Sequence, residues 1–111
     1  MSGLIIYIDR SEVREGKLEE LKTAINELGG LVMSNEPRLI AYNVHLTEDG
    51  TRMTVFHVHP DTASLEFHMK VAGPAFPKFV ELITLQTIDI YGEPNDNLVK
   101  QLRRKAQRLR A

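Results

Sequence analysis

Three of the four histidines lie within one short segment, 56-FHVHPDTASLEFH-68. His57 and His59 form an H-x-H pair, and His68 follows nine residues after His59. Imidazole can ligate a first-row metal through a neutral nitrogen, and it can transfer a proton near neutral pH. The segment therefore raises three alternatives: a metal site, an acid–base site, or histidines that only line and support the end of a strand.

The metal alternative depends on the direction of the two H-x-H rings. Residues i and i+2 of a strand share a face, so His57 and His59 could meet one ion. A zinc-type site needs a third protein ligand, for which His68 and Glu66 are the nearby candidates. H-x-H alone is a weak signal, and the chain has no cysteine. We therefore expect no metal at this pair.

The elements that must position these residues begin with a strand and a helix. Residues 3–9 are apolar and β-branched, as in a buried strand. Residues 11–16 have the composition of a turn that leads into a helix. Apolar residues then recur at helical spacing from Leu18 to Leu28, and Gly29-Gly30 predicts the end of that helix.

Two strand-like runs, residues 39–46 and 52–59, flank a segment that contains Asp49-Gly50. Asp-Gly between such runs is a strong hairpin signal, and a two-residue turn would pair Tyr42 with His57. That register places Tyr42, His57 and His59 on one face of the sheet, with Asn43 on the other.

The remainder of the chain predicts a second helix, a fourth strand and a terminal helix. Asp61 or Thr62 is expected to cap the second helix, and Gly73-Pro74 to interrupt it. Residues 84–91 alternate as a strand. The expected order is β-α-β-β-α-β, an α+β, ferredoxin-like arrangement with an antiparallel four-stranded sheet and an extra C-terminal helix. We expect one domain over residues 1–94 and a basic helix over residues 95–111.

Composition narrows the possible environments and partners. There is no cysteine, and no apolar run is long enough to cross a bilayer, so a cytoplasmic protein without a membrane partner is expected. From residue 98 onward lie six basic residues and no acidic ones, whereas the rest carries 8 basic and 15 acidic residues. Because the basic segment also has an apolar stripe and no aromatic residue, nucleic-acid binding is unlikely. Docking on its own domain or on a symmetry partner, or a plain solvated helix, is favoured instead.

Two segments resemble the antibiotic biosynthesis monooxygenase-like family, including its quinol monooxygenase-like members. Residues 36–44, EPRLIAYNV, are similar to the family pattern E-P-G-x-x-x-Y-x-V, with Arg38 in place of glycine. Residues 61–79 resemble the family's aspartate, helix start, histidine and aromatic end. The resemblance implies a homodimer in which two sheets close a dimeric α/β barrel, with a pocket between sheet and helices in each protomer.

The resemblance also implies an activity and a site. Small members oxidise quinols or polycyclic phenols with molecular oxygen, without metal or flavin, so the resemblance implies no cofactor. His68 takes the position of the family's helix histidine, so it is the expected catalytic base, although a hydrogen bond to a backbone carbonyl is the other explanation for it. The residues expected to bind a small aromatic ligand are Tyr42, Asn43, His57, His59 and Phe76.

The chain also departs from the family pattern. His57 and His59 replace a common Glu-x-Trp, and the second histidine of quinol-oxidising members falls near Ala75 or Phe76. Two functions are therefore expected as alternatives. One is a cofactor-independent monooxygenase for a small aromatic or quinol-like substrate, and the other is a non-catalytic small-molecule-binding or dimerisation module of the same fold.

Overall fold

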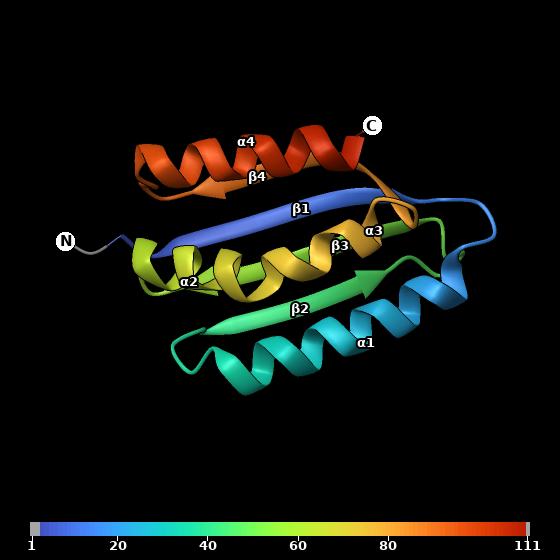
Figure 1. Cartoon of the computed structure of the whole chain (residues 1–111), viewed down its shortest axis with the longest axis horizontal. Helices are drawn as coiled ribbons and strands as arrows, with labels where there is room; N and C mark the ends of the chain where they lie inside the picture. Colours follow the sequence, from blue (N-terminus) through green and yellow to red (C-terminus); the bar gives the residue numbers. More distant parts are fainter. Residues whose placement is uncertain (1–2, 111) are drawn as a thin grey trace.

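The structure is a computed structural model that describes residues 3–110. Four strands and four α-helices follow in the expected ferredoxin-like order (Figure 1). Their bounds are β1 (Ile5–Val13), α1 (Leu18–Asn35), β2 (Ala41–Leu46), β3 (Arg52–His59), α2 (Thr62–Ala72), a 3-10 turn (Gly73–Ala75), α3 (Phe76–Phe79), β4 (Ile83–Tyr91) and α4 (Asp96–Arg110). The sheet is antiparallel with strand order β2-β3-β1-β4, which confirms the predicted fold class.

The helices pack on one face of this open sheet, which we call the inner face (Figure 1). Alternate residues of β1 and β3 are buried beneath them, as expected for strands with one covered face. In the single chain the sheet does not close into a barrel. Among residues 3–110, no helix combines the length and apolar character needed to span a membrane.

The β2–β3 hairpin has the predicted register. Tyr42 pairs with His57, and Ala41 pairs with Val58. The connection is longer than a two-residue turn, because the N–H of Gly50 donates to the carbonyl of Thr47 and the N–H of Thr47 donates to that of Arg52. The predicted pairing is nevertheless correct, because the longer loop is centred on Asp49-Gly50, as the two-residue turn would be.

The first strand is longer than predicted. Ser11, expected in a turn, pairs with Met53 on one side and Leu85 on the other. Its side chain is buried on the inner face. The prediction was wrong because Ser11 and Glu12 are poor strand formers by composition, whereas two flanking strands supply hydrogen bonds that composition cannot reveal.

Helix α1 continues through Gly29-Gly30 and ends only at Asn35, which corrects the predicted boundary. Neither glycine has a positive φ, so neither acts as a left-handed cap. The helix ends before Pro37, which disfavours a helical conformation at the preceding residue, Glu36. The backbone N–H of Glu36 donates to the carbonyl of Val32, which closes the last turn.

Helix α4 docks on its own domain through its apolar stripe, which is one of the alternatives expected from the sequence. Leu98 and Leu102 join one buried cluster, and Leu109 joins the other. Five of its six basic side chains are exposed, whereas Lys105 is buried against the sheet. The helix therefore also delivers a charged group to the interior.

Replacing Gly30 by alanine tests the corrected end of α1. Gly30 is exposed inside the helix, and a Cβ there would contact no atom within 4 Å. Since glycine costs roughly 1 kcal/mol relative to alanine in a helix interior, Gly30→Ala should raise the free energy of unfolding by about that amount in urea denaturation.

Gly92→Ala is the matched contrast. Gly92 has a φ of 119°, and a Cβ would lie 2.5 Å from the carbonyl oxygen of Leu4. This variant should be less stable than the parent. A loss of stability in Gly30→Ala would instead indicate that Gly30 caps the helix, and a boundary at Asn35 would then be wrong.

Candidate functional site

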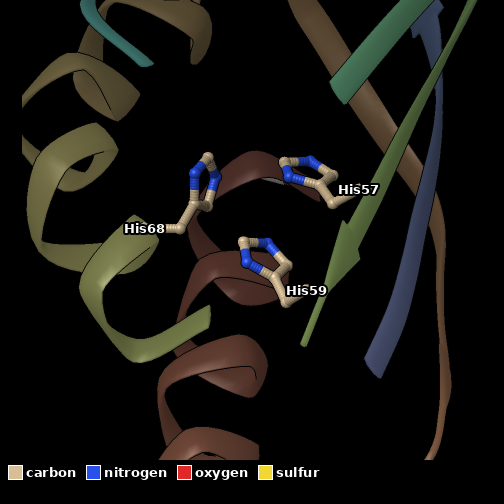
Figure 2. Close-up of side chains that lie close together, drawn as sticks. All are labelled: His57, His59 and His68. Carbon is tan, nitrogen blue, oxygen red and sulfur yellow. The ribbon is translucent and has the colours of Figure 1, made fainter. Parts of the chain in front are cut away.

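The three histidines of the motif come together beneath helix α2. His57 and His59 project from β3 to the inner face, and His68 projects from α2 toward them (Figure 2). Helix α2 is fixed by its N-cap, where the Asp61 carboxylate accepts from the N–H of Ser64 at 2.9 Å. All three imidazoles are almost fully buried.

The rings form a packed cluster with two tyrosines. The strand register places His57 between Tyr42 on β2 and Tyr7 on β1. The His57 ring stacks on Tyr7 with centroids 4.5 Å apart, and meets the ring of Tyr42 edge-on at 5.0 Å. The ring of His68 lies edge-on to that of His57 at 4.5 Å, and 5.6 Å from that of His59. These contacts restrict how far any of the rings can rotate.

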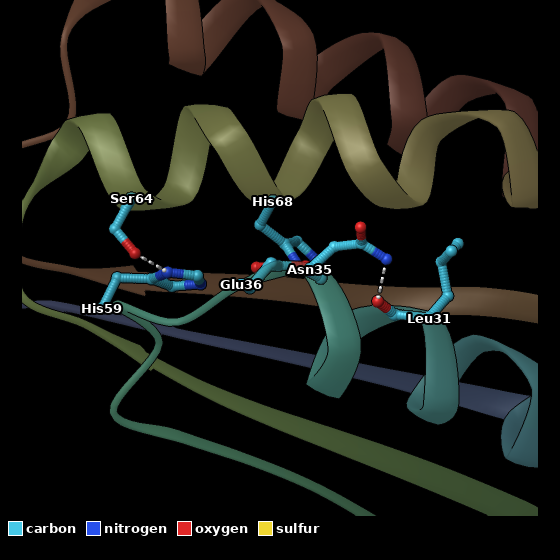
Figure 3. Close-up of polar contacts among 6 residues, drawn as sticks. All are labelled: Leu31, Asn35, Glu36, His59, Ser64 and His68. Carbon is cyan, nitrogen blue, oxygen red and sulfur yellow. Dashed lines mark hydrogen bonds and ion pairs between the residues drawn. The ribbon is translucent and has the colours of Figure 1, made fainter.

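His68 is held by a buried carboxylate. Both oxygens of Glu36 lie within hydrogen-bond distance of His68 Nδ1, at 2.9 and 3.1 Å, and the two residues face each other between α1 and α2 (Figure 3). An ionised carboxylate only accepts hydrogen bonds, so this contact assigns the proton to Nδ1. In the neutral form of the ring, the other nitrogen, Nε2, then carries a free lone pair.

His59 is held in a similar way by a hydroxyl. Its Nδ1 lies 2.8 Å from Ser64 Oγ (Figure 3). The opposite nitrogen, His59 Nε2, is buried and has no hydrogen-bond partner among the described residues, and the same is true of His57 Nδ1. Buried polar atoms without partners are uncommon, so these two nitrogens mark an unusual site.

The surroundings favour neutral imidazoles at His57 and His59. Burial lowers the pKa of His57 well below its ordinary value, and positive charge on His68 and Lys105 would lower it further. Burial also lowers the pKa of His59 to about 4, with a further contribution from His68. Both rings are therefore neutral at physiological pH, and neither can serve as a proton donor in its cationic form.

A pocket lies next to this cluster. His57, His68 and Tyr42 form part of its polar wall. The rest of the wall is mostly apolar and includes Leu28, Val44, Met53, Phe79, Leu85 and Leu109. An apolar cavity with a few polar groups at one wall is typical of a small-molecule site.

An ion pair completes the polar wall of the pocket. Lys105 Nζ lies 3.4 Å from the Asp9 carboxylate, donates to the hydroxyl of Tyr7, and lies 4.5 Å from the centre of the Phe76 ring. Burial lowers the pKa of Lys105, while Asp9 opposes that shift. Burial raises the pKa of Tyr7 well above its usual value, so its hydroxyl stays protonated.

The structure brings most of the expected site residues to this pocket. Tyr42, His57, His68 and Phe76 line it, and His59 lies beside His57 and His68. Asn43 lies exposed on the opposite face of the sheet, because it alternates with Tyr42 along β2.

Three further polar residues of the site were missed by sequence reasoning. Glu36 lies inside the family-like segment, and its contact with His68 joins residues 32 positions apart in the sequence. Asp9 sits in an apolar strand at an inward position, a pattern that could have identified it. Lys105 lies on the apolar stripe of α4, three residues after Leu102 and four before Leu109, which is the signal that could have predicted its burial.

The arrangement supports two kinds of chemistry. His68 Nε2 can accept a proton from a molecule in the pocket, while Glu36 stabilises the imidazolium that forms. The three histidines can also each offer one ligand nitrogen to a metal ion. Both uses depend on the same buried imidazole of His68.

Comparison with solved structures shows the same fold. MupZ from Pseudomonas fluorescens superposes with a TM-score of 0.75 at 19% identity, over 93% of this chain and 77% of that chain. SnoaB from Streptomyces nogalater, a cofactor-independent oxygenase, superposes with a TM-score of 0.68 at 12% identity, over 85% of this chain and 96% of that chain. A conserved protein from Methanosarcina mazei Go1 superposes with a TM-score of 0.69 at 22% identity, over 79% of this chain and 90% of that chain.

Sequence comparison identifies the family itself. Among curated proteins, none matches this chain significantly. The family model for antibiotic biosynthesis monooxygenase matches residues 4–82, which include every strand up to β3, helices α1 to α3 and the three clustered histidines. This match covers well over half of the chain, and the chain therefore belongs to the antibiotic biosynthesis monooxygenase family.

Proposed function

We propose that this protein oxidises a small aromatic hydroquinone or phenol with molecular oxygen and that His68 is the catalytic base. The observation that carries the proposal is the Glu36–His68 contact at the wall of an apolar pocket. Membership of the family supports the reaction class, and the fold shared with SnoaB agrees with it.

The base has a defined chemical role. His68 Nε2 takes the hydroxyl proton of the substrate, and Glu36 stabilises the resulting imidazolium through Nδ1. The anion that remains gives up an electron to oxygen more readily than the neutral hydroxyl does. Tyr42, whose pKa burial raises to about 12, stays protonated and can donate a hydrogen bond to the substrate.

The reaction balances without an external reductant. A hydroquinone and one O₂ give a hydroxyquinone and one water, with one oxygen atom in each product. Oxidation of the ring supplies two electrons, and conversion of a ring C–H to C–OH supplies the other two. The protein therefore has only to bind the substrate, remove a proton and exclude bulk water from the anion.

Substitution of His68 tests the catalytic role. His68→Ala should lower the rate of oxygen consumption with 1,4-naphthohydroquinone or an anthrone by at least about 100-fold, since a positioned base contributes roughly 10²- to 10⁴-fold. Glu36→Gln keeps the shape but weakens the support for the imidazolium, and we expect a smaller loss with a shifted pH–rate profile. An oxygen electrode, with chelator present, measures both.

Lys70→Ala is the matched control, because Lys70 is exposed on the same helix. It should leave the rate unchanged, and circular dichroism should show that all variants fold. An unchanged rate in His68→Ala would contradict the assigned base. Stoichiometric binding of the aromatic compounds without any oxygen consumption would instead support a non-catalytic binding module.

We also propose that the protein acts as a homodimer through the outer face of the sheet. The strand registers place Ala41, Val58, Ile6 and Tyr91 in one row across that face, and no described helix covers it. Tyr91 is 57% exposed. Proteins of this family are generally dimeric, and a second copy of the same apolar face would shield both.

A charge at the centre of the outer face should dissociate such a dimer. Phe56 pairs with Ile8 and Asn43 in the middle of this face. Phe56→Glu places two unpaired carboxylates in a two-fold interface, so the dissociation constant should rise by at least about 100-fold in sedimentation velocity. Met33→Glu, at a residue 75% exposed on α1, is the control and should sediment like the parent. A parent protein that is monomeric at micromolar concentration would refute the proposal.

A further inference from the structure

We propose that His57, His59 and His68 bind one divalent first-row metal ion, and that zinc is the ion their donor set fits best. Three imidazole nitrogens make a site with an open coordination position. His57 and His68 line the pocket, so that position would face it. The inference goes beyond the proposed oxidation, which uses no metal, and it departs from the expectation that the H-x-H pair binds none.

Each of the three rings has a nitrogen available for an ion. His59 uses Nδ1 for Ser64, and His68 uses Nδ1 for Glu36, which leaves both Nε2 atoms. His57 Nδ1 has no partner among the described residues. The three rings point toward one another (Figure 2). Their ligand nitrogens lie within 4.8 Å of each other.

The unpaired nitrogens are the strongest argument for a ligand. His57 Nδ1 and His59 Nε2 are both buried without a hydrogen-bond partner in the described part of the chain. Leaving such atoms unsatisfied costs stability. One metal ion between the rings would satisfy both nitrogens at once and explain why three imidazoles are packed in one place.

The hydrogen-bond partners of the ligand histidines support the proposed metal site. Metal-binding histidines almost always donate their other N–H to a carboxylate or another oxygen, which fixes the tautomer and the ring orientation. Glu36 occupies this position behind His68, and Ser64 occupies it behind His59. These partners present the two Nε2 atoms in the form that binds a metal.

The rings must draw together when the ion binds. Tetrahedral zinc at about 2.1 Å from each nitrogen separates its ligand atoms by about 3.4 Å. Because the ligand nitrogens of the cluster lie within 4.8 Å of one another, the required closure is at most about 1.4 Å. A small approach of α2, which carries His68, toward β3, which carries His57 and His59, can supply it.

The local charge is compatible with a cation. The Glu36 carboxylate contacts Nδ1 of His68, so it would add negative charge on the far side of that ring from the ion. Lys105 adds positive charge near His57, but Asp9 pairs with it at 3.4 Å, so the pair is close to neutral. An anionic oxygen from water or from a substrate in the pocket would supply the remaining negative charge at the open position.

The metal would compete with the proposed base. An ion bound to His68 Nε2 occupies the lone pair that would accept the substrate proton. The metal-loaded protein should therefore oxidise hydroquinones more slowly than the metal-free protein, and a chelator should restore the rate. This competition links the two proposals but does not make either depend on the other.

Titration of the chelator-treated protein with Co²⁺ and Zn²⁺ tests the site. We expect one ion per chain by calorimetry, with Co²⁺ giving the intense visible bands of four- or five-coordination and Zn²⁺ displacing it. His59→Ala should lower the affinity for the metal by more than about 100-fold, because loss of a ligand's hydrogen-bond partner alone lowers metal affinity by roughly 10- to 100-fold. Glu36→Gln should weaken it by about 10- to 100-fold.

His45→Ala is the matched control, because His45 is exposed on the outer face beside Phe56. It should leave both affinity and spectrum unchanged. An equal loss in His45→Ala and His59→Ala would place the ion elsewhere and overturn the proposal.

A measurement on the unmodified protein removes any dependence on how the variants fold. In ¹H–¹⁵N correlation spectra of the imidazoles, Zn²⁺ should shift Nε2 of His59 and of His68 and leave His45 unaffected. Absence of these shifts at saturating Zn²⁺, or the absence of one-to-one binding, would overturn the metal site. These readouts need no substrate, whereas oxygen consumption is followed with chelator present, so failure of one proposal is distinguishable from failure of the other.

Discussion

The buried contact between Glu36 and His68 is the interaction on which the site depends. Each side chain is about 2% exposed, so neither group can exchange its partner for water without opening the interface between α1 and α2. Removing one partner would leave a polar or charged group buried without a partner. The free-energy cost of that group is far larger than the net stabilisation that the pair provides. The contact therefore fixes both the packing of the two helices and the direction of the His68 ring.

Backbone features on both sides bring this contact about. On one side, α1 continues past two glycines and ends before Pro37, which places Glu36 at the end of the helix beside α2. On the other side, the Asp61 cap starts α2 so that Ser64 and His68, four residues apart, lie on the same side of the helix above β3. Ser64 then reaches His59 while His68 reaches Glu36.

The same polar cluster explains both proposed activities. A neutral imidazole with its Nδ1 held by a carboxylate can accept a proton or ligate a metal, and the choice depends on what enters the pocket. His57, stacked on Tyr7 and with a low pKa caused by burial, is suited to ligation and not to proton donation. Lys105 on α4, which lies beyond the residues matched by the family model, pairs with Asp9 on β1 to form a second polar group.

The sequence by itself determined the order of the elements, the register of the β2–β3 hairpin and the shared face of Tyr42, His57 and His59. These features follow from periods of two and 3.6 residues and from local turn chemistry, which neighbouring residues encode. Only the tertiary structure decided that α1 extends to Asn35, that Glu36 meets His68 and that Lys105 meets Asp9. Partners such as Glu36 and His68 lie 32 residues apart, and Lys105 and Asp9 lie 96 apart. The packing of whole helices on the sheet creates those contacts, so no local pattern could reveal them.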